Sequence, residues 1–299
     1  MSGGKVASPM ASTKPTSGDD ALASSPEKRG FSRAMVPLGA WVMRMVTALP
    51  NLALLILFVL AWQFASKVWI PSIDPHMAVL MPAPTTIAVT AAGMIVSGEL
   101  FYHLLDSLRR EAVAFAFSMT AVPLGIAMGW WRPVYNQVSP IMEILRPIPP
   151  LAWIPLSILW FGLGDEQNEF IIFLGIFFPI LVNTIVGVKN IDPSLIRAAR
   201  SLGASQFKIL TRVVLQGALP QIITGIRIGL GVGWMALVAA ELVGANSGLG
   251  FLINDARSML RTDIIIVGML TIGVVGLLID VAIRVVGRRL LPWSLVLSR

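Results

Sequence analysis

Residues 193–220, PSLIRAARSLGASQFKILTRVVLQGALP, form a polar, cationic segment that separates two long apolar blocks of the chain. The cations of this segment are Arg197, Arg200, Lys208 and Arg212. Asp192 followed by Pro193 is typical of a helix start, and Gly203 followed by Ser205 predicts a stop and a new N-cap. The segment therefore predicts two short helices that meet at a glycine and form a basic knob on the cytoplasmic side of a membrane protein.

The composition is that of a polytopic membrane protein. Of 299 residues, 56% are hydrophobic and 13% are charged, whereas a soluble domain carries about 25% charged residues. The net charge of +7 comes from cations scattered through loops, which does not favour a nucleic-acid partner and instead indicates cytoplasmic loops. With no cysteine and two distant histidines, neither a thiol nucleophile nor a metal site is expected.

Six stretches are long and apolar enough to cross a membrane. They are residues 45–66, 112–131, 139–164, 170–188, 217–243 and 264–286. They predict an all-α transmembrane domain over residues 45–292, between a disordered, basic tail (1–44) and a short tail (293–299). Loop cations place both termini in the cytoplasm, although Lys67, the pair Arg109 and Arg110, and the pair Arg257 and Arg261 resist this orientation. An interfacial helix is expected up to about residue 98, with Thr85 as its cap.

No catalytic signature is found in the sequence. The phosphate-binding motif GxxxxGK[S/T], the nucleophile motif GxSxG and the zinc motif HExxH are all missing. We therefore expect a chain that is not an enzyme and that takes its energy from another subunit.

Three stretches resemble known transport permeases. Ala198-Ala199, Gly203 and Leu219-Pro220 resemble the cytoplasmic "EAA" loop of ABC-importer permeases. Residues 146–155 (RPIPPLAWIP) and 225–242 (GIRIGLGVGWMALVAAEL) resemble the nitrate/sulfonate/taurine/bicarbonate permease family, the taurine-type members most closely. The resemblance covers about residues 50–293. The sequence departs from the broad pattern where it has Arg197 in place of the usual Glu, and where it has Gln216 in place of a common Pro.

The resemblance implies the type I ABC importer permease fold and a coupling loop, residues 189–216, that docks into the ATPase subunit. The residues expected to make this contact are Arg197, Ala198, Ala199, Leu202, Gly203, Ala204 and Phe207. It further implies a homodimer in a bacterial inner membrane with two ATPase copies and a periplasmic or lipid-anchored substrate-binding protein. ATP and Mg would be bound by the ATPase, and this chain would carry no cofactor. The expected solute is taurine or an alkanesulfonate, then nitrate or bicarbonate.

Residues inside the spans give candidates for a translocation pathway or hinge. They are Arg146, Pro147, Pro149, Pro150, Trp153, Arg227, Gly229, Gly233 and Glu241. The prolines break the third span, as a moving hinge or as a static kink. The glycines form a stripe that either packs helices or lines the pathway.

The charged residues within the spans have alternatives of their own. Arg227 faces an anionic solute or extends to the interface, and Glu241 is a gate, a contact for the binding protein or a satisfied buried acid. Asp280 and Arg284 are expected to pair, as are Glu143 and Arg146.

Two other classes of protein stay open. A secondary transporter would need no ATPase and should show an internal repeat and a coupling acid such as Glu241; no convincing repeat is found. A membrane-embedded enzyme would need a catalytic cluster that the sequence lacks.

Overall fold

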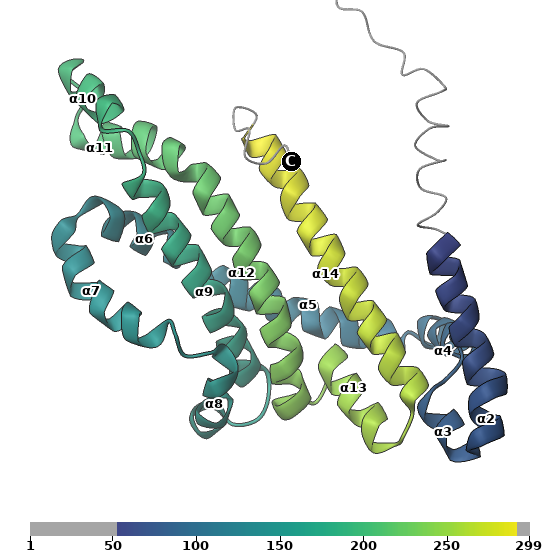
Figure 1. The fold of residues 1–299 in the computed structure, drawn as a ribbon. Coiled ribbons are helices and arrows are strands. Elements are labelled where there is room, and N and C mark those ends of the chain that lie inside the picture. Colours follow the sequence, from purple (N-terminus) through teal and green to yellow (C-terminus); the bar gives the residue numbers. More distant parts are fainter. Residues whose placement is uncertain (1–52, 292–299) are drawn as a thin grey trace, which may run out of the picture. The chain divides into compact units, whose positions relative to one another are not determined.

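The computed structural model describes residues 53–291, and every regular element in this range is a helix. The chain divides into two compact units, Met1–Leu54 and Leu55–Arg299, and the second contains all the labelled helices (Figure 1). The predicted tails 1–44 and 293–299 lie outside the described residues, as does the beginning of the first predicted span.

The described range begins with the helical residues 53–64, and sixteen labelled elements follow them. In order they are η1 (Ala65–Trp69), α2 (Ile70–Ile73), α3 (Pro75–Leu80), α4 (Pro84–Ser97), α5 (Glu99–Ser118), α6 (Ala121–Trp130), α7 (Arg132–Leu145), η2 (Pro150–Trp153), α8 (Ile154–Phe161), α9 (Asp165–Lys189), α10 (Pro193–Ser201), α11 (Gln206–Ile209), η3 (Leu210–Val214), α12 (Leu215–Gly244), α13 (Leu249–Ser258) and α14 (Thr262–Leu290). Here η1 and η3 are π-helical turns and η2 is a 3₁₀ turn.

Within the described residues, five helical segments are long and apolar enough to span a membrane. They are Ala53–Ile73, Glu99–Trp130, Asp165–Lys189, Gln206–Gly244 and Thr262–Leu290. A sixth span results if α7 is counted together with η2 and α8, which are bent from it by 83°. The prediction of about six transmembrane helices is therefore confirmed.

The bend in the third span lies where the sequence has its prolines. Helix α7 ends at Leu145, and the chain turns at Pro147 and Pro149 before helix resumes at Pro150. A proline removes a backbone N–H and its ring clashes with the preceding turn, so a straight helix cannot continue through this segment. The expectation of a broken helix is confirmed.

Helix α9 is the centre of the bundle and is more deeply buried than the other candidate spans of the described range. Glycines let its neighbours approach closely. A Cβ at Gly229 of α12 would lie 2.9 Å from the Ile176 carbonyl oxygen, and one at Gly125 of α6 would lie 2.7 Å from Thr184 Cβ. Glycines of α12 and of α6 therefore pack against α9 from different sides, as small residues do where helices associate in lipid.

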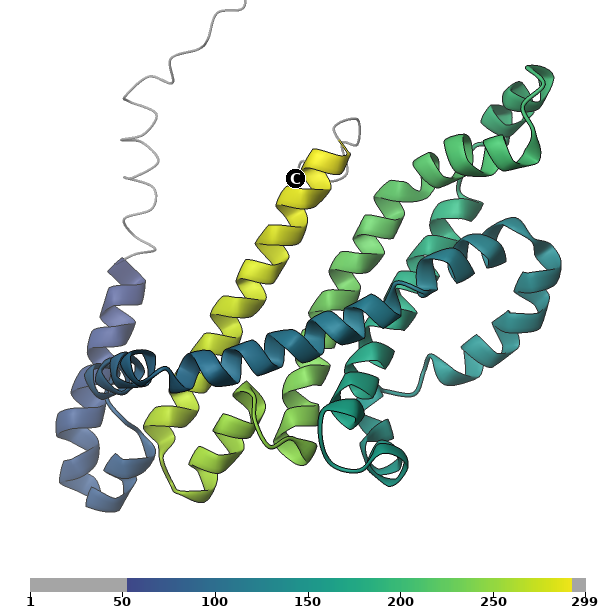
Figure 2. The same cartoon turned by 180° about the vertical axis from the view of Figure 1, so that it is seen from behind.

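Three local expectations are wrong. The second span is much longer than 112–131, because Glu99–Trp130 is one 32-residue helical segment that crosses α12 and α9 (Figure 2). Arg109 and Arg110 therefore lie within a helix. Helix α4 begins at Pro84 with Ala83 as its N-cap, so Thr85 is inside the helix and its backbone N–H binds the Gln63 side chain at 3.2 Å.

The second helix of the knob is not short. It runs from Gln206 through the π-helical turn η3 and on to Gly244, a segment of 39 residues. A span over residues 217–243 was expected from the apolar stretch that follows the cationic segment. Helical hydrogen bonds form inside the backbone, so they continue outside the apolar region as well.

Candidate functional site

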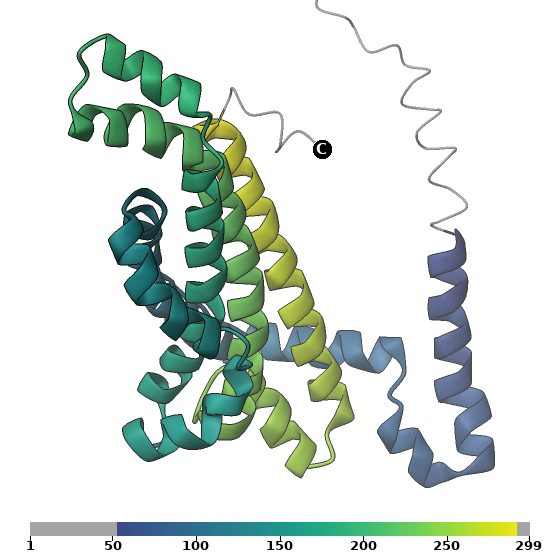
Figure 3. The same ribbon diagram turned by 60° about the vertical axis from the view of Figure 1, so that its left-hand side comes forward.

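The knob, defined as α10, α11 and the turn between them, projects from one end of the bundle (Figure 3). The side chain of Asp192 accepts a 2.8 Å hydrogen bond from the Ser194 N–H, and that of Ser205 accepts one of 3.4 Å from the Lys208 N–H. The Ser194 bond lowers the pKa of Asp192 below its ordinary value. Gly203 has a φ of +77°, a conformation that glycine adopts without steric cost. Both predicted caps and the glycine turn are confirmed.

The knob has an inner and an outer face. Ile196, Ala199 and Ala204 pack against a buried cluster that includes Ile209 and Val214. The outer face exposes apolar side chains: Leu202 is 87% exposed and Phe207 is 73% exposed. Among the residues expected to make the ATPase contact, Arg197, Ala198, Leu202, Gly203 and Phe207 are exposed, whereas Ala199 and Ala204 are partly buried and hold the two helices together.

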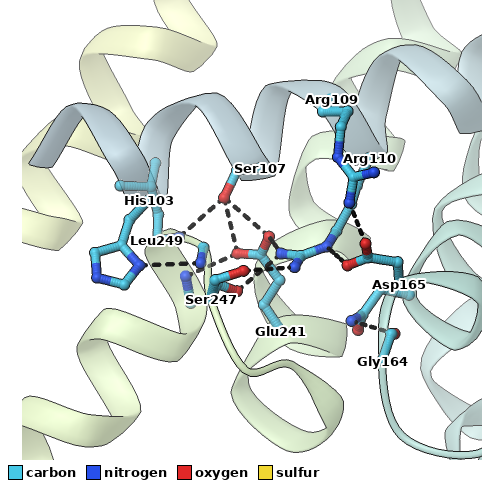
Figure 4. A network of polar contacts seen from close by, with 12 residues as sticks. His103, Ser107, Arg109, Arg110, Gly164, Asp165, Glu241, Ser247 and Leu249 are labelled. Atoms are coloured by element: carbon cyan, nitrogen blue, oxygen red, sulfur yellow. Dashed lines mark hydrogen bonds and ion pairs between the residues drawn. The ribbon is translucent and has the colours of Figure 1, made fainter. Parts of the chain in front are cut away.

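A buried network of charges lies at the opposite end of the bundle, where α9 begins and α12 ends. It centres on Arg110 of α5 (Figure 4). The Arg110 guanidinium donates to Glu241 at 2.7 Å, to Asp165 at 2.7 Å, and to the backbone oxygen and hydroxyl of Ser247 at 2.8 and 2.9 Å. Its side chain is 2% exposed. Arg109 also pairs with Asp165 but is half-exposed. The network joins α5, α9, α12 and the loop before α13.

Glu241 is fully satisfied inside this network. Its carboxylate accepts from the Ser107 hydroxyl at 2.9 and 3.0 Å and from the Gly250 N–H at 2.9 Å, and the residue is 1% exposed. A Cβ at Gly248, whose φ is +108°, would lie 2.3 Å from a Glu241 oxygen, so only glycine fits there. Of the three expectations for Glu241 (a gate, a contact for the binding protein or a satisfied buried acid), this position matches the satisfied buried acid.

The loop before α13 is held to α5 by two further backbone bonds. The Gly248 N–H donates to His103 Nδ1 at 3.1 Å, and the Leu249 N–H donates to the Ser107 hydroxyl at 2.9 Å. Sequence reasoning missed Arg110 and Ser107 as partners of Glu241, and Asp165 as a second partner of Arg110. The available signal was Arg109-Arg110, two adjacent cations that resist the orientation expected from the loop charges.

A second charged cluster connects α12 with α14. Arg227 donates to Asp280 at 2.7 Å, and Arg284 also pairs with Asp280. The predicted pair of Asp280 and Arg284 is confirmed. Arg227 forms an ion pair with the Asp280 carboxylate. The expectation for this residue was a solute contact or an interfacial position.

A cavity of about 560 Å³ lies between α7 and the helices α6 and α9. Its lining includes Glu143, Arg146 and Pro147 of the broken span, together with Tyr135 and Lys189. The Lys189 ammonium lies 3.4 Å from the Tyr135 ring centroid, a cation–π contact. No ion pair joins Glu143 to Arg146 anywhere in the described part of the chain, so that expectation is wrong and both charges face the cavity unpaired.

The remaining pathway candidates lie elsewhere. Pro149 and Pro150 form the bend, and Trp153 packs on a cluster of α9 and α12 side chains. Gly229 and Gly233 face Ile176 of α9 in the helix contact, so they do not line this cavity. Among residues 53–291, no group of three His, Asp or Glu side chains could hold a metal ion.

Comparisons with known proteins agree with this architecture. The family described as "Binding-protein-dependent transport system inner membrane component" matches residues 121–292. The taurine transport system permease protein TauC of Escherichia coli is 43% identical over 219 residues, which cover 71% of this chain and 80% of that protein. The nitrate import permease protein NrtB of Leptolyngbya laminosa is 35% identical over 64% of this chain and 70% of its own length.

A solved structure has the same fold. The MetNI methionine ABC transporter in an inward-facing conformation superposes with a TM-score of 0.55 at 23% identity, covering 62% of this chain and 93% of the matched chain. The match extends the similarity from sequence to the arrangement of the helices.

Proposed function

The chain belongs to the family of binding-protein-dependent transport system inner membrane components, and we propose that it is the translocating subunit of an ATP-driven importer of taurine or a related alkanesulfonate. The permease fold of an ABC importer and the similarity to ABC permeases do not favour a secondary transporter. Family members act in transport systems that depend on a binding protein.

The observation that carries the proposal is the exposed apolar surface of the knob. Leu202 and Phe207 are largely exposed at a tip that carries the cations Arg197, Arg200 and Lys208. An apolar patch rimmed by charges is typical of a protein interaction site. We assign the partner as the ATPase subunit, which binds ATP and Mg and hydrolyses the nucleotide, while this chain is not an enzyme and has no cofactor of its own.

Two copies of this chain with two ATPases and a periplasmic or lipid-anchored binding protein would complete the importer in a bacterial inner membrane. The basic knob belongs in the cytoplasm, where loops rich in Lys and Arg are retained. Both termini would lie on that same side.

The helices provide a direct route for force from the knob. Because α11 continues without interruption through η3 into α12, a push on Phe207 moves the whole of Gln206–Gly244. Helix α12 in turn is in close contact with α9 through Gly225 and Gly229. Movement of the ATPase is thereby passed to the central pair of helices and, through α9, to the cavity beside α7.

The coupling role is tested by replacing Leu202 with Asp in proteoliposomes that contain the ATPase and the binding protein. Since hot-spot side chains contribute about 2 kcal/mol or more, solute imported per ATP should fall about tenfold or more. Gln206→Asp adds the same charge to the exposed start of α11 without removing apolar surface, and should transport normally. Import by Leu202→Asp at the rate of the control would refute the docking assignment.

The cavity beside α7 supports an aminosulfonate as the solute. It presents an unpaired carboxylate, Glu143, and an unpaired guanidinium, Arg146, from positions i and i+3 of one segment. A zwitterion such as taurine carries the two complementary charges, an ammonium and a sulfonate, whereas nitrate carries only the negative one. The named taurine permease is also more similar to this chain than the named nitrate permease.

Substrate choice is tested with Glu143→Gln, which removes the negative charge and keeps the size of the side chain. Taurine import should fall about tenfold, the effect of one charge-assisted hydrogen bond, while ethanesulfonate, which lacks the ammonium, should be imported as before. Equal losses for both solutes would show that Glu143 does not recognise the ammonium. Import of nitrate in preference to both sulfonates would overturn the substrate class.

A further inference from the structure

A second cavity, of about 270 Å³, lies between the first described helix and the beginning of α14. Its lining includes Ser66, Lys67, Thr86, Arg261 and Asp263. Ser66 and Lys67 belong to the π-helical turn η1 in the candidate span Ala53–Ile73, and Arg261 is the N-cap of α14, directly before the span Thr262–Leu290. The cavity is thus at the end of two spans, the depth at which lipid headgroups lie.

The hydroxyl of Ser66 has no hydrogen-bond partner although the residue is only 6% exposed. Ser66 lines the cavity, so the unused donor is available to a group bound there. A buried polar group without a partner costs about 1–3 kcal/mol, which is why most such groups are satisfied. A π-helical turn such as η1 is itself frequent at functional sites.

The charge around the cavity is positive. Asp263 is fully engaged, because it accepts from Arg261 at 2.9 and 2.7 Å and from the Thr90 hydroxyl at 2.8 Å. Arg261 keeps its Nη1 group without a partner among residues 53–291, and the exposed Lys67 makes no ion pair in the same range. With two cations and one carboxylate, the lining carries a net charge of +1.

The rim of the cavity is apolar and exposed. Val79 and Leu260 line it, and Leu80 lies beside Val79; all three side chains are at least half exposed. Leu260 has a φ of +56°, a conformation that is uncommon for a residue other than glycine. Cations and a free hydroxyl inside, with aliphatic side chains outside, match a molecule that has an anionic head and hydrocarbon chains.

We propose that this cavity binds the phosphate of an anionic phospholipid, with Lys67 and Arg261 Nη1 contacting the phosphate and the Ser66 hydroxyl donating to it. The site also accounts for two cations that resist the orientation expected from loop charges, Lys67 and Arg261. The charge of Arg110 is neutralised by carboxylates of the protein itself. The charges of Lys67 and Arg261 are instead neutralised in part by the phosphate of a bound lipid.

The test is native mass spectrometry of the full chain purified with its partner subunits, titrated with phosphatidylglycerol, phosphatidylcholine or inorganic phosphate. We expect phosphatidylglycerol to bind about tenfold more tightly than phosphatidylcholine, and this preference to disappear in Lys67→Gln. Ser66→Ala should weaken phosphatidylglycerol binding severalfold, because it removes one hydrogen bond to a charged group.

Arg257→Gln is the matched control, because it removes an exposed cation of α13 that does not line the cavity, and it should bind lipid as the wild type does. Equal binding of the two lipids, or unchanged binding by Lys67→Gln, would overturn the proposal. Displacement of the lipid by inorganic phosphate alone would assign the cavity to a soluble anion. Lys67 is exposed, so the thermal midpoint of Lys67→Gln should equal that of the wild type and establishes that the variant is folded.

Discussion

The two ends of the bundle use charged residues in opposite ways. At the knob, Arg197, Arg200 and Lys208 are exposed around bare apolar side chains. At the other end, Arg110 and Glu241 are almost completely buried, and each hydrogen-bonding group of the Arg110 guanidinium meets a carboxylate or Ser247. A buried charge is tolerated only where it is paired, whereas an exposed one costs little. One end is therefore suited to contact a partner, and the other fixes four elements together.

The two ends also differ in how firmly they are attached to the rest of the bundle. The knob is joined to the bundle by the single continuous segment Gln206–Gly244 and by α9, so it can pass on a push. The network instead connects α5, α9, α12 and the loop before α13 through at least six hydrogen bonds. We expect mutations at the network to lower stability, and mutations at the outer face of the knob to change coupling with little loss of stability.

The largest loss of stability is expected for Arg110→Met. This change leaves Glu241 and Asp165 without their common partner, and an uncompensated buried charge costs about 3–5 kcal/mol. The free energy of unfolding, measured by denaturant titration in detergent micelles, should fall by this amount.

Arg109→Met is the control next in sequence. Among the described residues Arg109 pairs only with Asp165, and it is half-exposed, so its loss should cost about 1 kcal/mol or less. Adding Glu241→Leu to Arg110→Met should restore part of the stability, because the unpaired acid is removed. Equal effects of the two single arginine replacements would contradict the contrast between the buried and exposed ends.

An intermediate loss of stability is expected at the contact between α9 and α12, which connects the two ends of the bundle. A Cβ at Gly229 would lie 2.9 Å from the Ile176 carbonyl oxygen, so Gly229→Ala must push α12 away from α9. We expect this shift to lower the free energy of unfolding by about 1–3 kcal/mol. At Gly231, in the same helix, nothing lies within 4 Å of the added carbon, and Ala should stabilise by about 0.5–1 kcal/mol. The difference is measured by thermal unfolding of the two variants. A similar midpoint for both would show that the close approach of α12 to α9 does not stabilise the bundle.

The smallest effect is expected at the base of the knob, where Asp192 caps α10. Because the Ser194 N–H bond lowers the pKa of Asp192 below its ordinary 3.8, the ionised cap is stabilising above that pH and is lost as the pH falls through the lowered value. The protection of the first-turn amides of α10 against hydrogen exchange, expressed relative to the intrinsic exchange rate at each pH, should therefore fall in acid. Asp192→Asn keeps an uncharged cap and should remove this pH dependence, while Asp192→Ala should show low protection at every pH. An unchanged pH profile in Asp192→Asn would assign the effect to another group.

Much of the fold follows from local sequence. The caps at Asp192 and Ser205, the turn at Gly203 and the break near Pro147 each depend on the conformational preferences of a few adjacent residues. Span number follows from the length of apolar stretches, since about 20 residues cross the hydrocarbon core. These features were predictable because their causes lie within one or two helical turns.

The buried network was not predictable in the same way. Arg110 and Glu241 are 131 residues apart, and which acid neutralises which base depends on how α5 crosses α12. The sequence does show that Arg110 resists the orientation expected from the loop charges, but it does not indicate which residue pairs with it. For Glu143 and Arg146, spacing on the helix favours a pair, yet both side chains face the cavity beside α7 instead.

The most direct measurement of the central claim is crosslinking from the tip of the knob. The chain has no cysteine, so Leu202→Cys introduces a single thiol at the knob and Arg257→Cys a single thiol in α13. Helix α13 lies at the opposite end of the bundle from the knob (Figure 1). In the assembled transporter, a short thiol–amine crosslinker should join the ATPase subunit to Leu202→Cys and leave Arg257→Cys unlinked to it. An ATPase adduct missing from Leu202→Cys, or formed equally from both positions, would contradict the account.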